Sequence, residues 1–448
     1  MKVCKYEKIK DESDIKLVVD NIQKEQPYVV VIPTLVPIQE WLQKISISWF
    51  HDENAASHNA INELTEYCCS LADRLIKTPR RNEELKAIIR NQTSNMHHLA
   101  EDNADLLIDK IIKAEGYRLS CNLFIYFLRE QGRNAKILDT EEYMQINMER
   151  KPDIPYIQQS VKQYIADNQD ADLFVAPLSL CRNVYGETDF MSEKRNDYYA
   201  TALAVIFTAN EVILNTEINN IYTSRSILRN QHSLTYEEAE NLINSGVNLL
   251  YADCITLAAH SNLVIRVMDM DDLKTEKLYI SSNDTKNAVK AILVQDSVTF
   301  VRFKSLDVLP GYLLTSKVLD VIEKYKVHVI SMASSNVSIS MVLTISRDSL
   351  GIIQRELRKY AEMIVDENIS VVHIIGSLQW EQMPIESGII ETIKSIPISQ
   401  ISYGSSEHCL TLAVHTIDKK KLVDLLSQHY FSEQSFQFPF IVTNILQA

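Results

Sequence analysis

The stretch ISMASSN at residues 330–336 returns 71 residues later, at residues 401–407, as ISYGSSE. Both copies run into alternating apolar stretches, which are typical of strands with one buried face. These predicted strands lie at 337–343 and 408–414, and the helical stretches that follow them lie at 348–363 and 418–429. Two copies of such a unit predict paired α+β modules in the last third of the chain.

Short runs of β-branched or aliphatic residues alternate with helical periodicity through the part of the chain that precedes the repeat. These predicted strands lie at 2–6, 28–32, 135–138, 172–176, 211–214 and 263–268. One predicted helix carries apolar residues in steps of three and four from Ile61 to Leu75, a long polar one spans 82–113, and another near 119–128 stops at Gly132. The alternation predicts a largely parallel sheet with flanking helices.

Two further signals set the expected boundaries of the parts. Thr235 and Glu238 have the spacing of a capping box, which predicts a helix start. Residues 271–297 are more polar and are expected to form a linker region. We therefore expect one domain over 1–270 and the paired modules over 298–448.

The composition excludes several classes of protein. The formal net charge of the 448 residues is −14, which disfavours nucleic-acid binding and docking on anionic lipid. No apolar run approaches the roughly 18 residues of a spanning helix. Seven scattered cysteines without a CxxC pair, and histidines without HExxH, predict reduced thiols in the cytoplasm and no metal site.

Glycine is scarce, and its distribution bears on phosphate binding. Only 9 glycines occur, and Gly116 is the first of them. No loop in the preceding part of the chain can use glycine to bring backbone N–H groups against a phosphate. A conventional glycine-rich nucleotide site is therefore not expected there.

Four short strings resemble the aspartate kinase family, and their order along the chain is that of the family. They are TEINNIYT at 216–223, LTYEEA at 234–239, VLPGYL at 308–313 and ISYGSSEH at 401–408. The resemblance covers essentially the whole chain and implies an amino-acid-kinase domain followed by tandem ACT regulatory domains. The fold class it implies is α/β, followed by two α+β ACT-like domains. Family members transfer the γ-phosphoryl group of ATP, with Mg²⁺, to the side-chain carboxylate of aspartate, giving 4-phospho-L-aspartate for lysine, threonine and methionine biosynthesis.

The chain departs from the family at the positions that bind phosphate and substrate. The family string KFGGTS is KYEKIK at 5–10, so Glu7 and Lys8 replace both glycines. Where the family has a serine/glycine/threonine turn that binds substrate, this chain has PTLVPI at 33–38, and its prolines have no N–H to donate. Tyr117 stands where the resemblance places a substrate-facing glutamate, and Glu193 where it places an arginine that clamps the substrate. Ser224–Ser226 replace the family's DPR string, and Asn248 replaces the lysine of its KVLHP-like string.

Four positions of the kinase-like part keep the family residue. The resemblance makes Lys5 and Asp197 vestigial catalytic candidates, and Thr216 and Tyr222 weak nucleotide-binding candidates. Each has an ordinary structural reading as well. Lys5 can be a strand-end lysine, Asp197 can cap or begin a helix, and Thr216 and Tyr222 flank an asparagine turn.

The repeated turns supply the candidate effector-binding residues. The resemblance implies that paired ACT domains bind an amino acid such as lysine or threonine, and that they assemble a homodimer or heteromer. The serines of these turns can also be simple loop residues. The candidates are Gly311, Ser331, Ser334, Ser335, Asn336, Ser402, Ser405, Ser406 and Glu407.

Three functions remain open from the sequence. The favoured one is an aspartate kinase homologue with lost or impaired catalysis that acts as an amino-acid-sensing or regulatory subunit. The second is an active aspartate kinase whose loops are rebuilt, with lysines serving as phosphate point charges and MgATP as the phosphoryl donor. The third is a purely structural subunit of a heteromer, which differs from the first in binding no effector.

Overall fold

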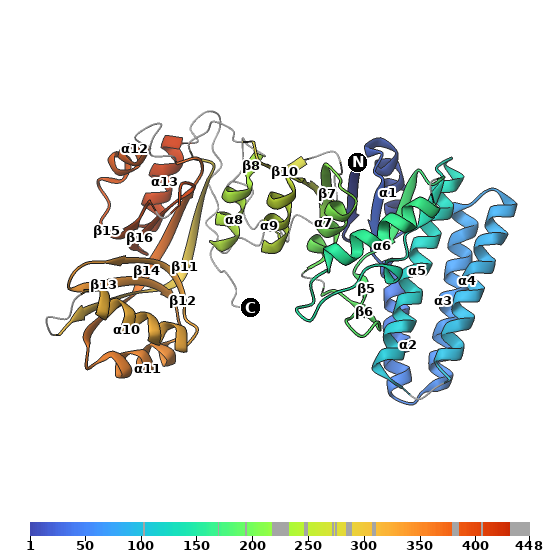
Figure 1. The fold of residues 1–448 in the computed structure, drawn as a ribbon, viewed down its shortest axis with the longest axis horizontal. Helices are drawn as coiled ribbons and strands as arrows, with labels where there is room; N and C mark the ends of the chain where they lie inside the picture. Colours follow the sequence, from blue (N-terminus) through green and yellow to red (C-terminus); the bar gives the residue numbers. More distant parts are fainter. Residues whose placement is uncertain are drawn as a thin grey trace. The chain divides into compact units, whose positions relative to one another are not determined.

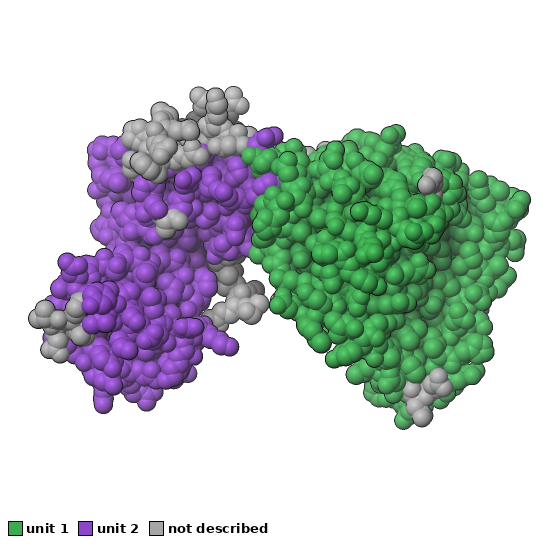
Figure 2. All heavy atoms as spheres, viewed as in Figure 1, with its two compact units in different colours: residues 1–218, 250–282 green, residues 219–249, 283–448 purple. Residues whose placement is uncertain are grey.

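A computed structural model describes most of the chain, and it divides into two compact units (Figure 2). The first unit comprises residues 1–218 and 250–282, and the second comprises 219–249 and 283–448, so the chain passes between them three times. The described residues are 1–101, 104–168, 170–192, 195–216, 233–245, 250–270, 273, 276–283, 289–306, 311–378, 385–404 and 406–430. No helix among them combines the length and apolar character that crossing a membrane requires.

The first unit is built on a sheet whose central strands are buried on both faces. Its strands within this unit follow the order β3 (Ala135–Ile137), β4 (Leu173–Pro177), β2 (Val29–Ile32), β1 (Lys2–Tyr6), β7 (Glu211–Thr216), β9 (Val264–Asp269) and β10 (Glu276–Ser281). All neighbours are parallel except β10, which is antiparallel to β9. Every residue of β2 and β4 is buried, as expected of a parallel sheet covered by helices. The predicted largely parallel sheet is confirmed.

Helices flank this sheet, and four long ones pack side by side (Figure 1). The four are α2 (Val36–Phe50), α3 (Asn54–Leu75), α4 (Pro79–Leu99) and α5 (Leu106–Glu130), and the others are α1 (Glu12–Glu25), α6 (Ile154–Asp167), α7 (Asn196–Ile206) and α9 (Ala252–Ser261). The prediction of one helix over 82–113 is wrong. The Asp105 carboxylate caps the backbone N–H groups of Leu107 and Ile108 and so begins a new helix. Gly132 follows α5 with a φ of 87°, a conformation that suits glycine at a helix end.

The stretch expected to be a linker contains regular structure. Within 271–297, β10 belongs to the sheet of the first unit, and β11 (Ala291–Ser305) begins in the second. Residues 219–249, expected in the first domain, group with the second unit. Polar composition did not reveal the strands, because β10 is a short strand that itself begins with two charged residues, Glu276 and Lys277.

The second unit contains one antiparallel sheet with two helical layers. The strand order is β12 (His328–Ser334), β13 (Ser338–Thr344), β11, β14 (Ala361–Ile375), β16 (Cys409–His415) and β15 (Ile398–Ser402). The helices are α8 (Tyr236–Asn244), α10 (Gly311–Lys324), α11 (Arg347–Leu357), α12 (Ile385–Ile393) and α13 (Lys419–Tyr430), and a short strand, β8 (Ser233–Thr235), precedes α8. One hydrophobic core forms beneath α10 and α11 and another beneath α12 and α13, and a third, smaller one joins residues of β11, β13, β14 and β16.

The element order confirms the duplication that the repeat predicts. Two strands and a helix follow one another in each copy, as β12–β13–α11 and as β15–β16–α13. The helix expected over 348–363 ends at Leu357, because Ala361 already pairs with Ser305 in the sheet. The capping box of α8 is present: Glu238 N–H donates to Thr235 Oγ1 at 3.2 Å, and Thr235 N–H donates to Glu238 Oε2 at 2.8 Å.

Candidate functional site

Lys5 lies near the carboxyl end of β1, in the interior of the first unit. Its side chain is 2% exposed, and Nζ donates to Asp197 Oδ1 at 2.8 Å from the first turn of α7. Burial lowers the pKa of Lys5, but the carboxylates of Asp197 and Glu7 more than offset this, and the pKa is raised overall. The structure therefore brings together the two catalytic candidates as a charged pair.

Glu7 follows β1 and contacts the end of the neighbouring strand β7. Thr216 Oγ1 donates a hydrogen bond to the Glu7 carboxylate. Asn215, one residue earlier, donates from Nδ2 to the carbonyl oxygen of Lys5 at 2.9 Å. Thr216, a nucleotide-binding candidate, is thus engaged by a carboxylate that stands where the resembled family has glycine.

The loop between β2 and α2 uses its backbone amides within the protein. Leu35 N–H donates to Ser120 Oγ of α5 at 3.1 Å, and Val36 N–H donates to the carbonyl oxygen of Ile9 at 3.0 Å. Pro37 in the first turn of α2 has no N–H. The amides of Leu35 and Val36 are therefore committed to intramolecular partners before any ligand arrives. The sequence did not reveal these contacts, because Ser120 is 85 residues away from Leu35.

Tyr117 of α5 packs on an aromatic residue rather than presenting a carboxylate. Its ring centroid lies 5.0 Å from that of Phe190 in β6 (Thr188–Phe190). The next residue, Arg118, makes ion pairs with Glu115, Asp139 and Glu141. Burial lowers the pKa of Arg118, but these carboxylates raise it overall. Sequence reasoning missed this network, which fixes α5 against the segment after β3.

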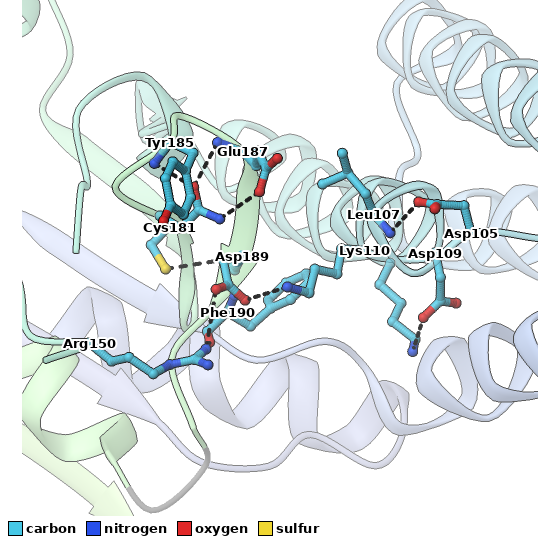
Figure 3. Close-up of polar contacts among 12 residues, drawn as sticks. Asp105, Leu107, Asp109, Lys110, Arg150, Cys181, Tyr185, Glu187, Asp189 and Phe190 are labelled. Atoms are coloured by element: carbon cyan, nitrogen blue, oxygen red, sulfur yellow. Dashed lines mark hydrogen bonds and ion pairs between the residues drawn. The ribbon is translucent and has the colours of Figure 1, made fainter. Parts of the chain in front are cut away.

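A second polar network surrounds Asp189 beside Phe190. Figure 3 shows Lys110 and Arg150 reaching its carboxylate from opposite sides, and the two ion pairs measure 3.0 and 3.3 Å. Asp189 is 7% exposed, and its carbonyl oxygen accepts from Cys181 Sγ at 3.4 Å. The hairpin of β5 (Leu180–Arg182) and β6 is thereby anchored to α5. Sequence reasoning did not single out any of these residues.

The start of α7 is held by Arg195 rather than by a capping side chain. Arg195 donates to the carbonyl oxygens of Glu149 and Arg150 at 3.2 and 2.9 Å and lies 5.3 Å from the ring centre of Tyr251. Asp197 lies in the first helical turn, as the ordinary reading of this residue expects. The replaced positions Glu193, Ser224–Ser226 and Asn248, together with Tyr222, lie outside the described residues.

Three of the effector candidates meet in the first module. A Cβ built on Gly311, the first residue of α10, would lie 2.7 Å from the carbonyl oxygen of Ser335 and 3.0 Å from Cα of Asn336. The turn between β12 and β13 therefore packs directly on the start of α10. Ser334, Ser335 and Asn336 are exposed there, and Ser335 Oγ stabilises the turn through Ser338.

The candidates of the second module lie in a different environment. Ser406 Oγ accepts from the backbone N–H of His408 at 3.1 Å, and the carbonyl oxygen of Glu407 accepts from Leu378 N–H at 2.8 Å. Ser402 ends β15, and Ser405 lies outside the described residues. The two modules are linked by Gln400, whose Nε2 donates to the buried Ser331 Oγ at 3.1 Å.

Metal ligands do not gather in the part of the chain that the structure describes. No group of three or more histidine, cysteine, aspartate or glutamate side chains there could hold an ion. The adjacent side chains of His97 and His98 have different surroundings. His97 Nδ1 lies 2.7 Å from Nδ1 of His58 in α3, while His98 is exposed.

Comparison with known proteins agrees with this architecture. Residues 69–269 match the amino acid kinase family model. The lysine-sensitive aspartokinase 3 of Escherichia coli is 22% identical over 365 residues, which is 78% of this chain and 81% of that protein. The aspartokinase of Saccharomyces cerevisiae is 19% identical over 412 residues, covering 81% of this chain and 78% of that one.

Solved structures share the fold over nearly the whole length. E. coli aspartokinase III in complex with aspartate and ADP has a TM-score of 0.62 at 19% identity, covering 96% of this chain and 100% of that one. Clostridium acetobutylicum aspartate kinase has a TM-score of 0.74 at 15% identity, covering 96% and 99%. With its parallel kinase-like sheet and its duplicated antiparallel half, the chain has the fold of these aspartate kinases, and residues 69–269 match the amino acid kinase family model.

Proposed function

We propose that this protein serves amino-acid biosynthesis as an aspartate kinase homologue whose phosphoryl transfer is lost or impaired, and that it acts as an amino-acid-sensing or regulatory subunit in the cytoplasm. The observation that carries the proposal is the loop between β2 and α2. Its Leu35 and Val36 amides are bonded to Ser120 and Ile9. Phosphoryl transfer depends on such donors to position phosphates and stabilise the transferred charge.

The charge around Lys5 supports the same conclusion. A family phosphate site offers positive charge and amide donors, whereas Glu7 brings a carboxylate to Thr216 beside the Lys5–Asp197 pair. A phosphate group placed there would be repelled by the Glu7 carboxylate. Losing a single charge-stabilising donor typically lowers the rate by about 10²–10³. Since several donors are engaged or replaced, the described residues do not fit MgATP in the manner the family resemblance implies.

The sensing role rests on the second unit. The turn of Ser334–Asn336 is exposed, and it packs against the start of α10, where backbone N–H groups favour a carboxylate. One relative is named as lysine-sensitive, and E. coli aspartokinase III has been solved in complex with lysine and aspartate. We therefore propose lysine or threonine as the effector, bound by a homodimer or heteromer through these modules.

Calorimetric titration of the full chain with MgATP, with and without aspartate, tests the catalytic part of the proposal. We expect no saturable binding at millimolar MgATP, while a parallel titration of E. coli aspartokinase III gives saturable binding. Titration with lysine, threonine and methionine tests the sensing part, and we expect one of them to bind and to raise the melting temperature. If none binds, the purely structural subunit becomes the better description.

An active aspartate kinase is the second candidate, because Lys5 and Asp197 both match the residues of the resembled family and Lys5 Nζ lies 2.8 Å from Asp197 Oδ1. Such a pair could orient a charged substrate if the lysines near it replaced the missing amides. Saturable MgATP binding, followed by formation of 4-phospho-L-aspartate, would favour this candidate over the regulatory one.

A further inference from the structure

Two half-buried histidines meet between the neighbouring helices α3 and α4, in a part of the first unit that the proposed function does not use. His58 lies near the start of α3 and His97 near the end of α4, and the two helices pack side by side (Figure 1). Their Nδ1 atoms are 2.7 Å apart, and the ring planes are inclined by only 19°. Two ring nitrogens at this distance share one proton, because one of them must donate and the other must accept.

Asn62 determines which of the two nitrogens is the acceptor. It follows His58 by one turn of α3, and its Oδ1 lies 3.2 Å from Nε2 of His97. An amide oxygen only accepts, so Nε2 of His97 carries the hydrogen, and Nδ1 of the neutral ring carries the lone pair. The shared proton therefore belongs to Nδ1 of His58. A hydrogen bond at the remote ring nitrogen is also how proteins commonly orient a histidine toward a metal ion.

The surroundings of His97 favour its neutral form. Burial lowers the pKa of His97 below its usual value near 6.5, and the neighbouring His58 and His98 lower it further, while Glu101 acts in the opposite direction. A neutral imidazole is the form that binds metal ions, so protons compete weakly for His97 near pH 7. The Glu101 carboxylate, which is close enough to act on the ring, also favours a cation nearby.

From this geometry we propose that His58 and His97 form a binding site for a divalent transition-metal ion of the class that imidazole prefers, such as Zn²⁺, Ni²⁺ or Cu²⁺. The ion lies between the two Nδ1 atoms, where one proton lies now. That proton moves to Nε2 of His58, so both rings stay neutral and no proton leaves the pair. The inference goes beyond the proposed function, since it requires neither MgATP nor an amino-acid effector.

The histidine pair needs little rearrangement to hold such an ion. Metal–nitrogen bonds of about 2.0–2.1 Å in tetrahedral geometry place the two nitrogens about 3.3 Å apart, so they must separate by roughly 0.6 Å. Small rotations of two half-exposed side chains supply this movement. Two protein ligands leave the other positions to water, so the ion would link α3 to α4 and remain accessible to chelators.

Calorimetric titration of the full-length, tag-free protein with NiCl₂, after EDTA has been used and removed, tests the proposal. We expect saturable binding and a rise of the melting temperature. His58→Ala and His97→Ala each remove one ligand and should abolish this binding. Both variants keep all seven cysteines, so binding by thiols would persist in them. Asn62→Ala removes no ligand but frees the His97 ring, and it should weaken binding by about 10–100-fold.

His98→Ala is the matched control, because it removes the adjacent histidine, whose side chain is 73% exposed, and should bind Ni²⁺ as the wild type does. Excess MgCl₂ should not displace Ni²⁺, since Mg²⁺ prefers oxygen ligands. Melting temperatures in EDTA show whether each variant folds, and glutamine replaces alanine at a position where it does not. The proposal is overturned if the wild type gives no saturable binding, if His58→Ala and His97→Ala bind Ni²⁺ unchanged, or if His98→Ala abolishes binding as they do.

Discussion

The candidate polar groups of the first unit and those of the turn between β12 and β13 in the second unit lie in opposite environments. In the first, Lys5 is buried and paired with Asp197, Thr216 is bonded to Glu7, and the Leu35 amide is bonded to Ser120. In the second, Ser334, Ser335 and Asn336 stand exposed at a turn. A polar group that is satisfied inside the fold stabilises it, whereas an exposed turn can exchange water for a ligand at little cost. The contrast is the one expected if the second unit is the ligand-recognising part, as the proposed sensing role requires.

The largest expected effect comes from breaking the buried pair of the first unit. Asp197→Asn leaves the Lys5 ammonium buried without its carboxylate and should cost about 3–5 kcal/mol of stability. For a unit of this size the melting temperature should fall by roughly 10 °C. Asp170→Asn is the matched control, since it breaks the Lys136–Asp170 pair at the surface of the same unit and should change the melting temperature little. Equal effects of the two variants would contradict a structural role for the Lys5–Asp197 pair.

The next effect is a pH dependence of the second unit. Burial lowers the pKa of His373 in β14 to about 4, while an unfolded histidine titrates near 6.5. The unfolded state therefore binds the proton first as the pH falls. The stability from a neutral His373 is complete above about pH 6.5 and is lost progressively down to about pH 4, in total about 3 kcal/mol.

Urea unfolding of the second unit between pH 7 and pH 4, followed by a probe within that unit, measures this loss. His373→Leu should flatten the profile across this window, although it also leaves Thr411 without the partner that lies 3.1 Å away. Replacing the exposed His328 by leucine should preserve the slope. A profile of unchanged slope in His373→Leu would assign the acid sensitivity to other groups.

Much of this architecture could be predicted from local patterns, since the repeat and the strand–helix alternation each report a buried face. The resemblance selected Lys5 and Asp197, but only the fold shows them to be in contact, because they lie 192 positions apart. The Leu35–Ser120 bond, the Asp189 network and the His58–His97 contact were missed for the same reason. Long-range polar contacts leave no periodic trace in a sequence. The place of α8 in the second unit was missed because its neighbours in sequence belong to the first.

A moderate effect should distinguish the two glycines of the first module. Gly311→Ala places a methyl group 2.7 Å from the backbone oxygen of Ser335, so the turn must move, at a cost of about 1–3 kcal/mol. Gly351→Ala in α11 meets nothing within 4 Å and should stabilise the module by about 0.5–1 kcal/mol. Urea unfolding measures the free energy of unfolding of both variants. Gly311→Ala should also weaken binding of the amino-acid effector, and unchanged binding would place the effector elsewhere.

The smallest expected effect concerns Glu7→Gly, which restores the residue of the resembled family at one position. It removes the carboxylate from Thr216, yet the amides of Leu35 and Val36 stay bonded to Ser120 and Ile9. We therefore expect no saturable calorimetric binding of MgATP at millimolar concentration, since removing repulsion does not supply the missing donors. Lys8→Gly, added to Glu7→Gly, should behave in the same way. Binding regained by the single variant would show that repulsion by one carboxylate, rather than closure of the β2–α2 loop, separates the first unit from a working kinase site.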